Sequence, residues 1–185
     1  MNADDAFNYG AIGGVSGHVM THGFDDQGSQ FDKDGNLINW WTEEDRARFE
    51  ERTKVMEEYF NAIEVAPGVY ANGAFTLGEN IADHGGLQVA YQAFLNNEKL
   101  KGENGKLGTV EGFTPEQRFF LAYANVWAGN IRPEEVLQRT KSDPHSLGMW
   151  RVNGALPHIG AWYEAWNVTP ESPLYLEPEK RVSIW

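Results

Sequence analysis

Apolar residues recur at helical spacing in several stretches of the chain, and this pattern predicts a mainly helical fold. After Thr42, an acidic first turn precedes apolar positions three and four residues apart, which predicts a helix over residues 43–63. Residues 114–117 (Thr-Pro-Glu-Gln) combine an N-cap, a proline at the first helical position and a glutamine at the third, and they predict a helix over residues 115–127. Further helices are predicted over residues 76–97, 133–141 and 155–166.

A glycine-rich helix is predicted near the start of the chain, over residues 7–22, with Asp4 or Asp5 as its N-cap. Each glycine inside a helix costs about 1 kcal/mol relative to alanine. The glycines lie three and four residues apart, at Gly10, Gly13, Gly14 and Gly17. Because this spacing places them on one stripe, we predict that another backbone packs closely there and that the helix is buried.

Turn-forming residues separate the predicted helices. Residues 23–41 are irregular, and residues 33–36 favour a short hairpin. Turns are predicted at 67–68 and 72–73, and a mobile polar loop at 99–112. The proline-rich tail after residue 166 is predicted to be extended. Because the chain has no internal repeat and no domain linker, we predict a single domain over residues 1–185.

Composition limits the chemistry that this chain can carry out. With 41% hydrophobic and 23% charged residues the chain is typical of a globular protein, and its net charge of −12 argues against nucleic acid or anionic lipid as a partner. No apolar run approaches the roughly 20 residues that cross a bilayer. The chain has no cysteine, so any bound metal must be held by His, Asp or Glu.

Two histidines four residues apart, His18 and His22, carry the strongest chemical signal. This spacing places both imidazoles on one face of a helix, where they can reach one metal ion. Catalytic zinc sites in peptidases often use two histidines and a glutamate, and Glu79 can complete that set. Asp83 follows Glu79 by one helical turn and is suited to accept a hydrogen bond from a ligating histidine. These residues are therefore a candidate site for one Zn²⁺ ion per chain.

Simpler interpretations of the same residues exist. Histidines at this spacing are more often solvated or satisfied core residues, and Glu79 follows Thr76 by three positions, as in a capping box. A calcium loop is a weaker alternative. Its ligands would come from residues 32–43, but Leu37 occupies the position where an EF-hand requires glycine. A solvated turn explains that stretch better.

Several longer motifs resemble the neprilysin-like family of zinc metallopeptidases, and they occur in the family's order along nearly the whole chain. They are Gly17-His18-Val19-Met20-Thr21-His22-Gly23-Phe24-Asp25-Asp26, Trp40-Trp41-Thr42, Gly78-Glu79-Asn80-Ile81-Ala82-Asp83-His84-Gly85-Gly86, Trp127 with Arg132-Pro133-Glu134, Asp143-Pro144-His145-Ser146 with Arg151, and the terminal Arg181-Val182 and Trp185. The resemblance implies a mainly α, thermolysin-like zincin fold with short β and loop segments. It further implies that the chain is a catalytic-lobe fragment from the C-terminal part of such an enzyme.

The resemblance also implies roles for individual residues. His18, His22 and Glu79 would bind zinc, and Asp83 would hold a ligating histidine. The substrate of such an enzyme is a peptide, cleaved by a zinc-activated water.

Two more residues acquire roles only through the resemblance. His145, oriented by Asp143, would stabilise the oxyanion of the tetrahedral intermediate, and Arg151 would hold a substrate carbonyl. From spacing alone, His145 is typical of a loop histidine and Arg151 of a surface charge.

The chain departs from the family pattern at Val19, where His-Glu-x-x-His peptidases carry the glutamate that acts as general base. Loss of general acid–base catalysis typically costs ~10²- to 10⁴-fold in rate, so we expect a zinc-binding but catalytically impaired protein. The alternative is a non-catalytic pseudo-peptidase that acts as a peptide-binding or scaffold protein. The family's N-terminal lobe is expected to be absent from this chain, and the family implies an extracytoplasmic location, periplasmic or secreted.

Overall fold

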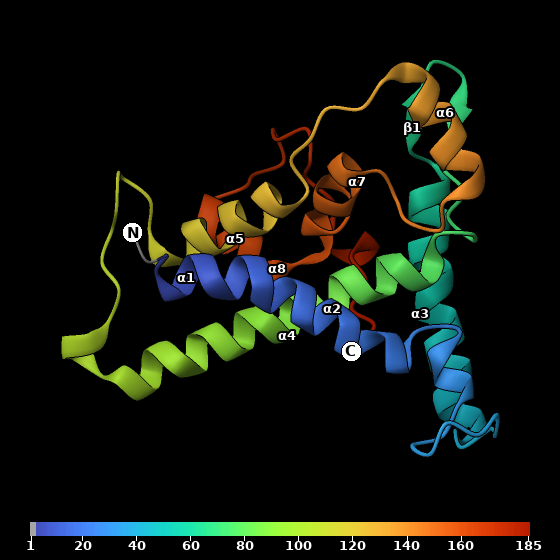
Figure 1. The fold of residues 1–185 in the computed structure, drawn as a ribbon, viewed down its shortest axis with the longest axis horizontal. Helices are drawn as coiled ribbons and strands as arrows, with labels where there is room; N and C mark the ends of the chain where they lie inside the picture. The colour runs from blue at the N-terminus through green and yellow to red at the C-terminus, as the bar shows by residue number, and fades with distance from the viewer. Residues whose placement is uncertain (1–2) are drawn as a thin grey trace.

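A computed structural model describes residues 3–185 of the chain, and it is mainly helical (Figure 1). The α-helices are α1 (Asp5–Asn8), α2 (Gly14–Thr21), α3 (Glu43–Asn61), α4 (Leu77–Lys101), α5 (Pro115–Val126), α6 (Pro133–Ser142), α7 (Gly148–Asn153) and α8 (Gly160–Trp166). A π-helical turn, η1 (Tyr9–Gly13), joins α1 to α2. The 3-10 turns are η2 (His22–Phe24), η3 (Gly28–Gln30), η4 (Glu103–Gly105), η5 (Leu156–His158) and η6 (Pro178–Lys180).

The first three helical segments form one helical stretch from Asp5 to Thr21, close to the predicted 7–22. Asp4 is the N-cap, and its side chain accepts a hydrogen bond of 2.9 Å from the backbone N–H of Phe7. The π-helical turn in the middle was not predicted, because a single wider turn leaves no clear signature in sequence periodicity. It re-phases the side chains of α2, which carries His18, relative to those of α1.

The glycine stripe does bring other backbones very close, as predicted. The prediction that the helix is buried is wrong, because only the glycine face is covered while Ile12 and Val19 are 65% and 63% exposed. A β-carbon on Gly17 would lie 2.4 Å from the carbonyl oxygen of Gly86 in α4, and one on Gly86 would lie 2.2 Å from the nitrogen of His18. A β-carbon on Gly10 would lie 2.1 Å from the carbonyl oxygen of Phe119 in α5. The N-terminal helical stretch therefore lies directly against both α4 and α5, as Figure 1 shows.

Two hydrophobic clusters form the core. The larger one joins the N-terminal helical stretch, α4, α5 and α8 through Ala6, Leu87, Ala90, Phe94, Phe119, Phe120, Tyr123, Leu156, Ile159, Trp162 and Tyr163. The smaller one joins α3, the first turns of α4 and the C-terminal tail through Phe49, Met56, Phe60, Ile63, Ile81, Val182 and Ile184. Helix α4 contributes to both clusters, so it is the central element of the fold. None of the helices within residues 3–185 is both long and apolar enough to cross a membrane.

The predicted ends of several elements need correction. Helix α4 runs to Lys101, beyond the predicted residue 97, and takes in part of the predicted loop. The predicted helix over 155–166 is wrong in its first part: Pro157 lies in η5 and Ile159 is extended, so α8 begins only at Gly160. Helix α7 was not predicted.

The sheet also differs from the sequence prediction. Strands β1 (Glu64–Ala66) and β2 (Val69–Tyr70) pair antiparallel across the predicted turn at Gly68, whose φ of 72° suits glycine. At the predicted hairpin, by contrast, only an isolated bridge joins Phe31 to Leu37.

We predict that Gly17→Ala lowers the free energy of unfolding by about 1–3 kcal/mol, because the added methyl group has no room against the Gly86 backbone. Urea unfolding followed by circular dichroism measures the change. Gly23→Ala is the matched control, because nothing lies within 4 Å of its β-carbon position. Equal free energies of unfolding for the two variants would show that α2 can move away from α4 without loss of stability.

Candidate metal centre

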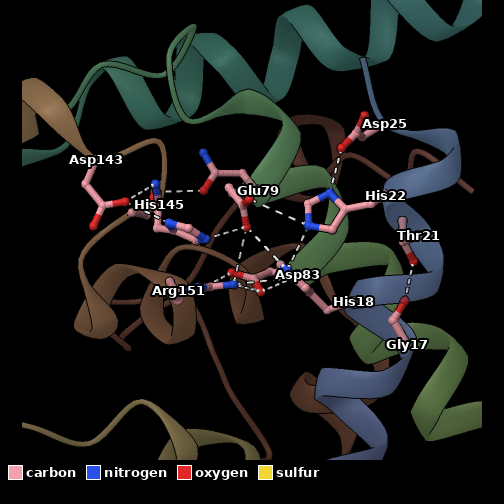
Figure 2. A network of polar contacts seen from close by, with 12 residues as sticks. Gly17, His18, Thr21, His22, Asp25, Glu79, Asp83, Asp143, His145 and Arg151 are labelled. Atoms are coloured by element: carbon pink, nitrogen blue, oxygen red, sulfur yellow. Dashed lines mark hydrogen bonds and ion pairs between the residues drawn. The ribbon is translucent and has the colours of Figure 1, made fainter. Parts of the chain in front are cut away.

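Helix α2, the turn η2 that follows it and helix α4 bring His18, His22 and Glu79, respectively, to one point (Figure 2). The Nε2 atoms of the two histidines lie 3.0 Å apart, and Glu79 lies 3.3 Å from His18 Nε2 and 3.6 Å from His22 Nε2. Ligand atoms around a tetrahedral zinc ion with bonds of about 2.0–2.1 Å lie roughly 3.3 Å apart. The observed distances bracket that value. The three residues predicted as ligands from the sequence therefore converge on a space of the size that zinc requires.

The protonation pattern of the two histidines also fits a cation. Each imidazole directs Nδ1 toward a carboxylate, His18 toward Asp83 at 2.8 Å and His22 toward Asp25 at 2.7 Å. With a proton on each Nδ1, both Nε2 atoms present lone pairs to each other and to Glu79. Such a cluster of electron pairs needs a positive charge at its centre, and the Glu79 Oε2 atom is buried without a hydrogen-bond partner.

The pKa of His18 reflects the same electrostatic field. Burial opposes the charged imidazolium, but the hydrogen bond that the ring donates to Asp83 and the nearby carboxylate of Glu79 outweigh it and raise the pKa of His18 from 6.5 to about 9. A proton and a metal ion compete for this nitrogen. The site therefore attracts a cation, and the residues present fit a divalent metal.

Asp25 is a further contact of the histidine pair, and its sequence position alone does not establish this contact. Its Oδ2 contacts His22, while its Oδ1 accepts hydrogen bonds from the backbone N–H groups of Gln27 (2.9 Å) and Gly28 (2.7 Å). The carboxylate is thus fixed by the turn that follows η2. The sequence does contain a signal for this contact: Asp25 follows His22 by three residues, a spacing that places both side chains on the same side of a helical turn.

Arg151 is buried beside the cluster, with 6% of its surface exposed. Its Nε and Nη2 atoms each lie 2.7 Å from an oxygen of Asp83, and its guanidinium lies 3.7 Å from the ring centroid of Trp127. The interpretation of Arg151 as a surface charge is therefore wrong. Asp83 binds both His18 and Arg151, as Figure 2 shows.

His145 approaches Glu79 from the side opposite the two histidine ligands (Figure 2). Its Nε2 lies 3.3 Å from Glu79 Oε2, and its Nδ1 lies 2.7 Å from Asp143. Asp143 also accepts the backbone N–H of His145, at 3.0 Å. His145 does lie in a loop, as its local sequence indicates, but the loop joins it to Asp143 and Glu79. A groove of about 700 Å³ opens beside it and is lined by Trp127, Asp143, His145 and Arg151, among others.

Val19 lies outside this polar network. It follows His18 on α2 and is 63% exposed. An isopropyl side chain carries no group that accepts or donates a proton. The contacts that hold the metal-binding cluster together do not involve Val19.

The competing interpretations of the sequence are resolved by the geometry. Thr76 makes no capping hydrogen bond with its side chain, so Glu79 does not belong to a capping box. Asp32 accepts the backbone N–H groups of Asp34 and Asn36, both at 2.9 Å, which is the solvated turn expected there. Within the part of the chain that the structure describes, His18, His22 and Glu79 are the one group of three or more His, Asp or Glu side chains close enough together to hold a metal ion.

Two histidines one turn apart, a glutamate from a second helix and a carboxylate behind each histidine are typical of zinc metallopeptidase centres. The chain belongs to peptidase family M13, whose family model matches residues 1–182. It is 43% identical to human neprilysin over 183 residues, which is 98% of this chain and 24% of that protein. It is 42% identical to endothelin-converting enzyme 1 of Cavia porcellus, over 97% of this chain and 23% of that protein.

Solved structures show the same fold. The crystal structure of the Mycobacterium tuberculosis zinc metalloprotease ZMP1 in complex with an inhibitor matches 99% of this chain with a TM-score of 0.92 at 42% identity, covering 28% of that protein. PEPO of Lactobacillus rhamnosis matches with a TM-score of 0.86 at 35% identity, covering 100% of this chain and 27% of that protein. The chain thus spans roughly a quarter of the length of these relatives. The predicted mainly helical fold with a minor sheet is confirmed.

We predict that Arg151→Met lowers the free energy of unfolding by about 3–5 kcal/mol, because it leaves the buried carboxylate of Asp83 without its cationic partner. Arg139→Met is the matched control: Arg139 pairs with Glu135 on the exposed surface of α6, and such pairs contribute less than about 1 kcal/mol. Both values follow from urea titrations at neutral pH. A decrease of less than about 1 kcal/mol in the free energy of unfolding of Arg151→Met would contradict this prediction. It would show that His18 alone is enough to balance the negative charge of Asp83.

Proposed function

We propose that this chain is the zinc-binding C-terminal part of an M13 metalloendopeptidase that acts on peptides. The convergence of the Nε2 atoms of His18 and His22 with the Glu79 carboxylate is the observation that carries the proposal. When bound, zinc would act as a Lewis acid and lower the pKa of a bound water. Membership of family M13 supports this function and an extracytoplasmic location.

The chain's own residues would prepare the site for that chemistry. Asp83 and Asp25 hold the two imidazoles in the tautomer that leaves Nε2 free for the metal. Glu79 supplies the negative charge that neutralises part of the cation. The two histidine–carboxylate pairs fix the direction of both lone pairs before any ligand binds, which limits the reorganisation that binding requires.

His145 and Arg151 are placed to contact a peptide. In its imidazolium form His145 donates from Nδ1 to Asp143, and its Nε2–H can then point toward an oxyanion that develops beside Glu79. Arg151 uses Nε and Nη2 for Asp83, which leaves Nη1 to donate to a substrate carbonyl. The groove that both residues line is concave and large enough for peptide side chains.

The chain has no proton-accepting side chain at position 19, where His-Glu-x-x-His peptidases carry their general base. Val19 stands there, and valine cannot accept a proton from a bound water. We therefore propose that the chain binds zinc but hydrolyses peptides poorly. We further propose that residues 1–185 form one catalytic-lobe domain, and that a complete substrate cleft requires the N-terminal lobe that the rest of a relative's length supplies.

Val19 also favours a second candidate function, that of a pseudo-peptidase. Such a protein keeps the metal and the peptide groove, and binds peptides or partner proteins without cleaving them. Every contact around His18, His22 and Glu79 is compatible with this function, because none of them uses position 19. Restoring the base separates the two candidates.

Zinc content tests the metal site. We predict one zinc ion per purified chain by mass spectrometry after exchange into metal-buffered solution. His18→Ala should lose affinity by more than the ~10- to 100-fold expected for Asp25→Asn, which removes only a residue that orients His22. His145→Ala should retain the metal, because His145 is a neighbour of Glu79 and not a ligand. Full zinc affinity in His18→Ala would refute the site.

Val19→Glu tests the missing base. We predict that it raises peptide hydrolysis by the zinc-loaded chain by ~10²- to 10⁴-fold, the usual contribution of general acid–base catalysis. Val19→Gln is the control, because it has nearly the same shape as glutamate and no basic oxygen. Equal rates for the two variants would contradict the role of position 19. Rapid hydrolysis by the unaltered chain would refute the impairment itself.

A further inference from the structure

The loop of residues 143–147 carries His145, but the helix before it does not determine where the loop lies. Helix α6 has no buried residue, and its end is joined to the loop only by its own chain and by the hydrogen bond from Asp143 N–H to the Arg139 carbonyl oxygen. Only Val136 and Thr140 are partly buried, in a helix that contacts β1, so α6 is held weakly. Another contact must therefore hold His145 near Glu79.

Asn80 provides that contact. It follows Glu79 on α4 and is buried, with 2% of its surface exposed. Its Nδ2 donates to Thr76 Oγ1 at 2.9 Å, and its Oδ1 accepts from Ser146 Oγ at 2.7 Å. The Thr76 hydroxyl in turn donates to the Asn72 carbonyl oxygen at 3.0 Å, so it must accept from Asn80. This relay fixes the orientation of the amide and directs Oδ1 toward Ser146.

We infer that Asn80 is a positioning residue that holds His145 against Glu79 through Ser146. Within residues 3–185, the bond between Ser146 and Asn80 is the one hydrogen bond from this loop to α4, apart from the His145–Glu79 ion pair itself. Because Asn80 and Glu79 are adjacent on one helix, the loop is tied to the same turn that carries the metal ligand. The inference rests on the proposed function, in which His145 serves the oxyanion.

The position of His145 can be measured without any activity. We predict that Ser146→Ala shifts the ring signal of His145 in the nuclear magnetic resonance spectrum of the full chain with ¹³C-labelled histidine, and increases the ring's mobility on the nanosecond timescale. The signal is assigned by its absence in His145→Ala. Asn80→Leu should produce the same change, and Ser146→Thr, which keeps the hydroxyl, should restore the original signal.

Ser142→Ala is the matched control for this measurement, because Ser142 donates to the Gln138 carbonyl oxygen within α6 and makes no bond to α4. If Asn80→Leu fails to fold, Ser146→Ala decides the question alone, because Ser146 is only partly buried. A His145 signal that moves no more in Ser146→Ala than in Ser142→Ala would overturn the inference.

The affinity of the zinc-loaded chain for a phosphinic peptide, a stable analogue of the tetrahedral intermediate, tests whether this positioning matters for the proposed chemistry. We predict that Ser146→Ala weakens binding by about three- to tenfold, the effect of one lost hydrogen bond. The same substitution should have no further effect in a His145→Ala background. A further loss in that background would mean that Ser146 acts elsewhere, and would overturn the inference.

The two measurements separate the inference from the proposed function. If His145→Ala binds the phosphinic peptide as tightly as the unaltered chain does, the oxyanion role of His145 is wrong. A shifted His145 signal in Ser146→Ala would still establish that Asn80 and Ser146 position the ring. If the signal does not shift, the positioning role is refuted whatever the affinity for the phosphinic peptide.

Discussion

The close approach of two backbones at Gly17 and Gly86 is the constraint on which the rest of the site depends. Neither position has room for a β-carbon, so α2 and α4 lie as near as two helices can. His18 follows Gly17 directly, and Glu79 and Asp83 lie on the turns of α4 that precede Gly86. Any separation of the helices would move a histidine away from its carboxylates. The cost of glycine in the helices is offset by the contacts that this approach allows.

Once the helices are in contact, electrostatics determines the state of the side chains. Asp25, Glu79 and Asp83 concentrate negative charge around two imidazoles, and Arg151 neutralises the most buried of these carboxylates. A site of this kind binds a positive charge whether that charge is a proton on His18 or a metal ion. The ability to hold a cation is therefore a property of the helix contact and the carboxylates. It does not require the residue that performs proton transfer.

Position 19 illustrates this separation. In the zincin pattern the general base shares a helical turn with two metal ligands, so metal binding and catalysis look like one motif. In the structure, the contacts of His18 and His22 with Asp83, Asp25 and Glu79 are complete without Val19, whose side chain is exposed. In the proposed function, metal binding and proton transfer are therefore assigned to different residues, and a change at position 19 is expected to leave metal binding intact.

Those features of the structure that have local physical causes can be predicted from the sequence alone. The capping box at Thr114 fixed the start of α5, and the spacing of His18 and His22 put both imidazoles on one helix face. The glycine stripe indicated a close backbone contact, although not the partner. Element ends were less predictable: Pro157 and the π-helical turn change the course of helices whose periodicity looks regular.

Which residues from distant parts of the sequence contact the site can be seen only in the tertiary structure. Arg151 has the local sequence of a surface residue and becomes buried because Asp83, far away in sequence, supplies the opposite charge. Asn80 and Ser146 likewise carry no signal of their own until α4 and the His145 loop meet. The spacing of residues in the sequence reflects the geometry of a single helix, whereas the contacts of Arg151 with Asp83 and of Ser146 with Asn80 depend on how separate elements pack together. That packing is a property of the whole chain.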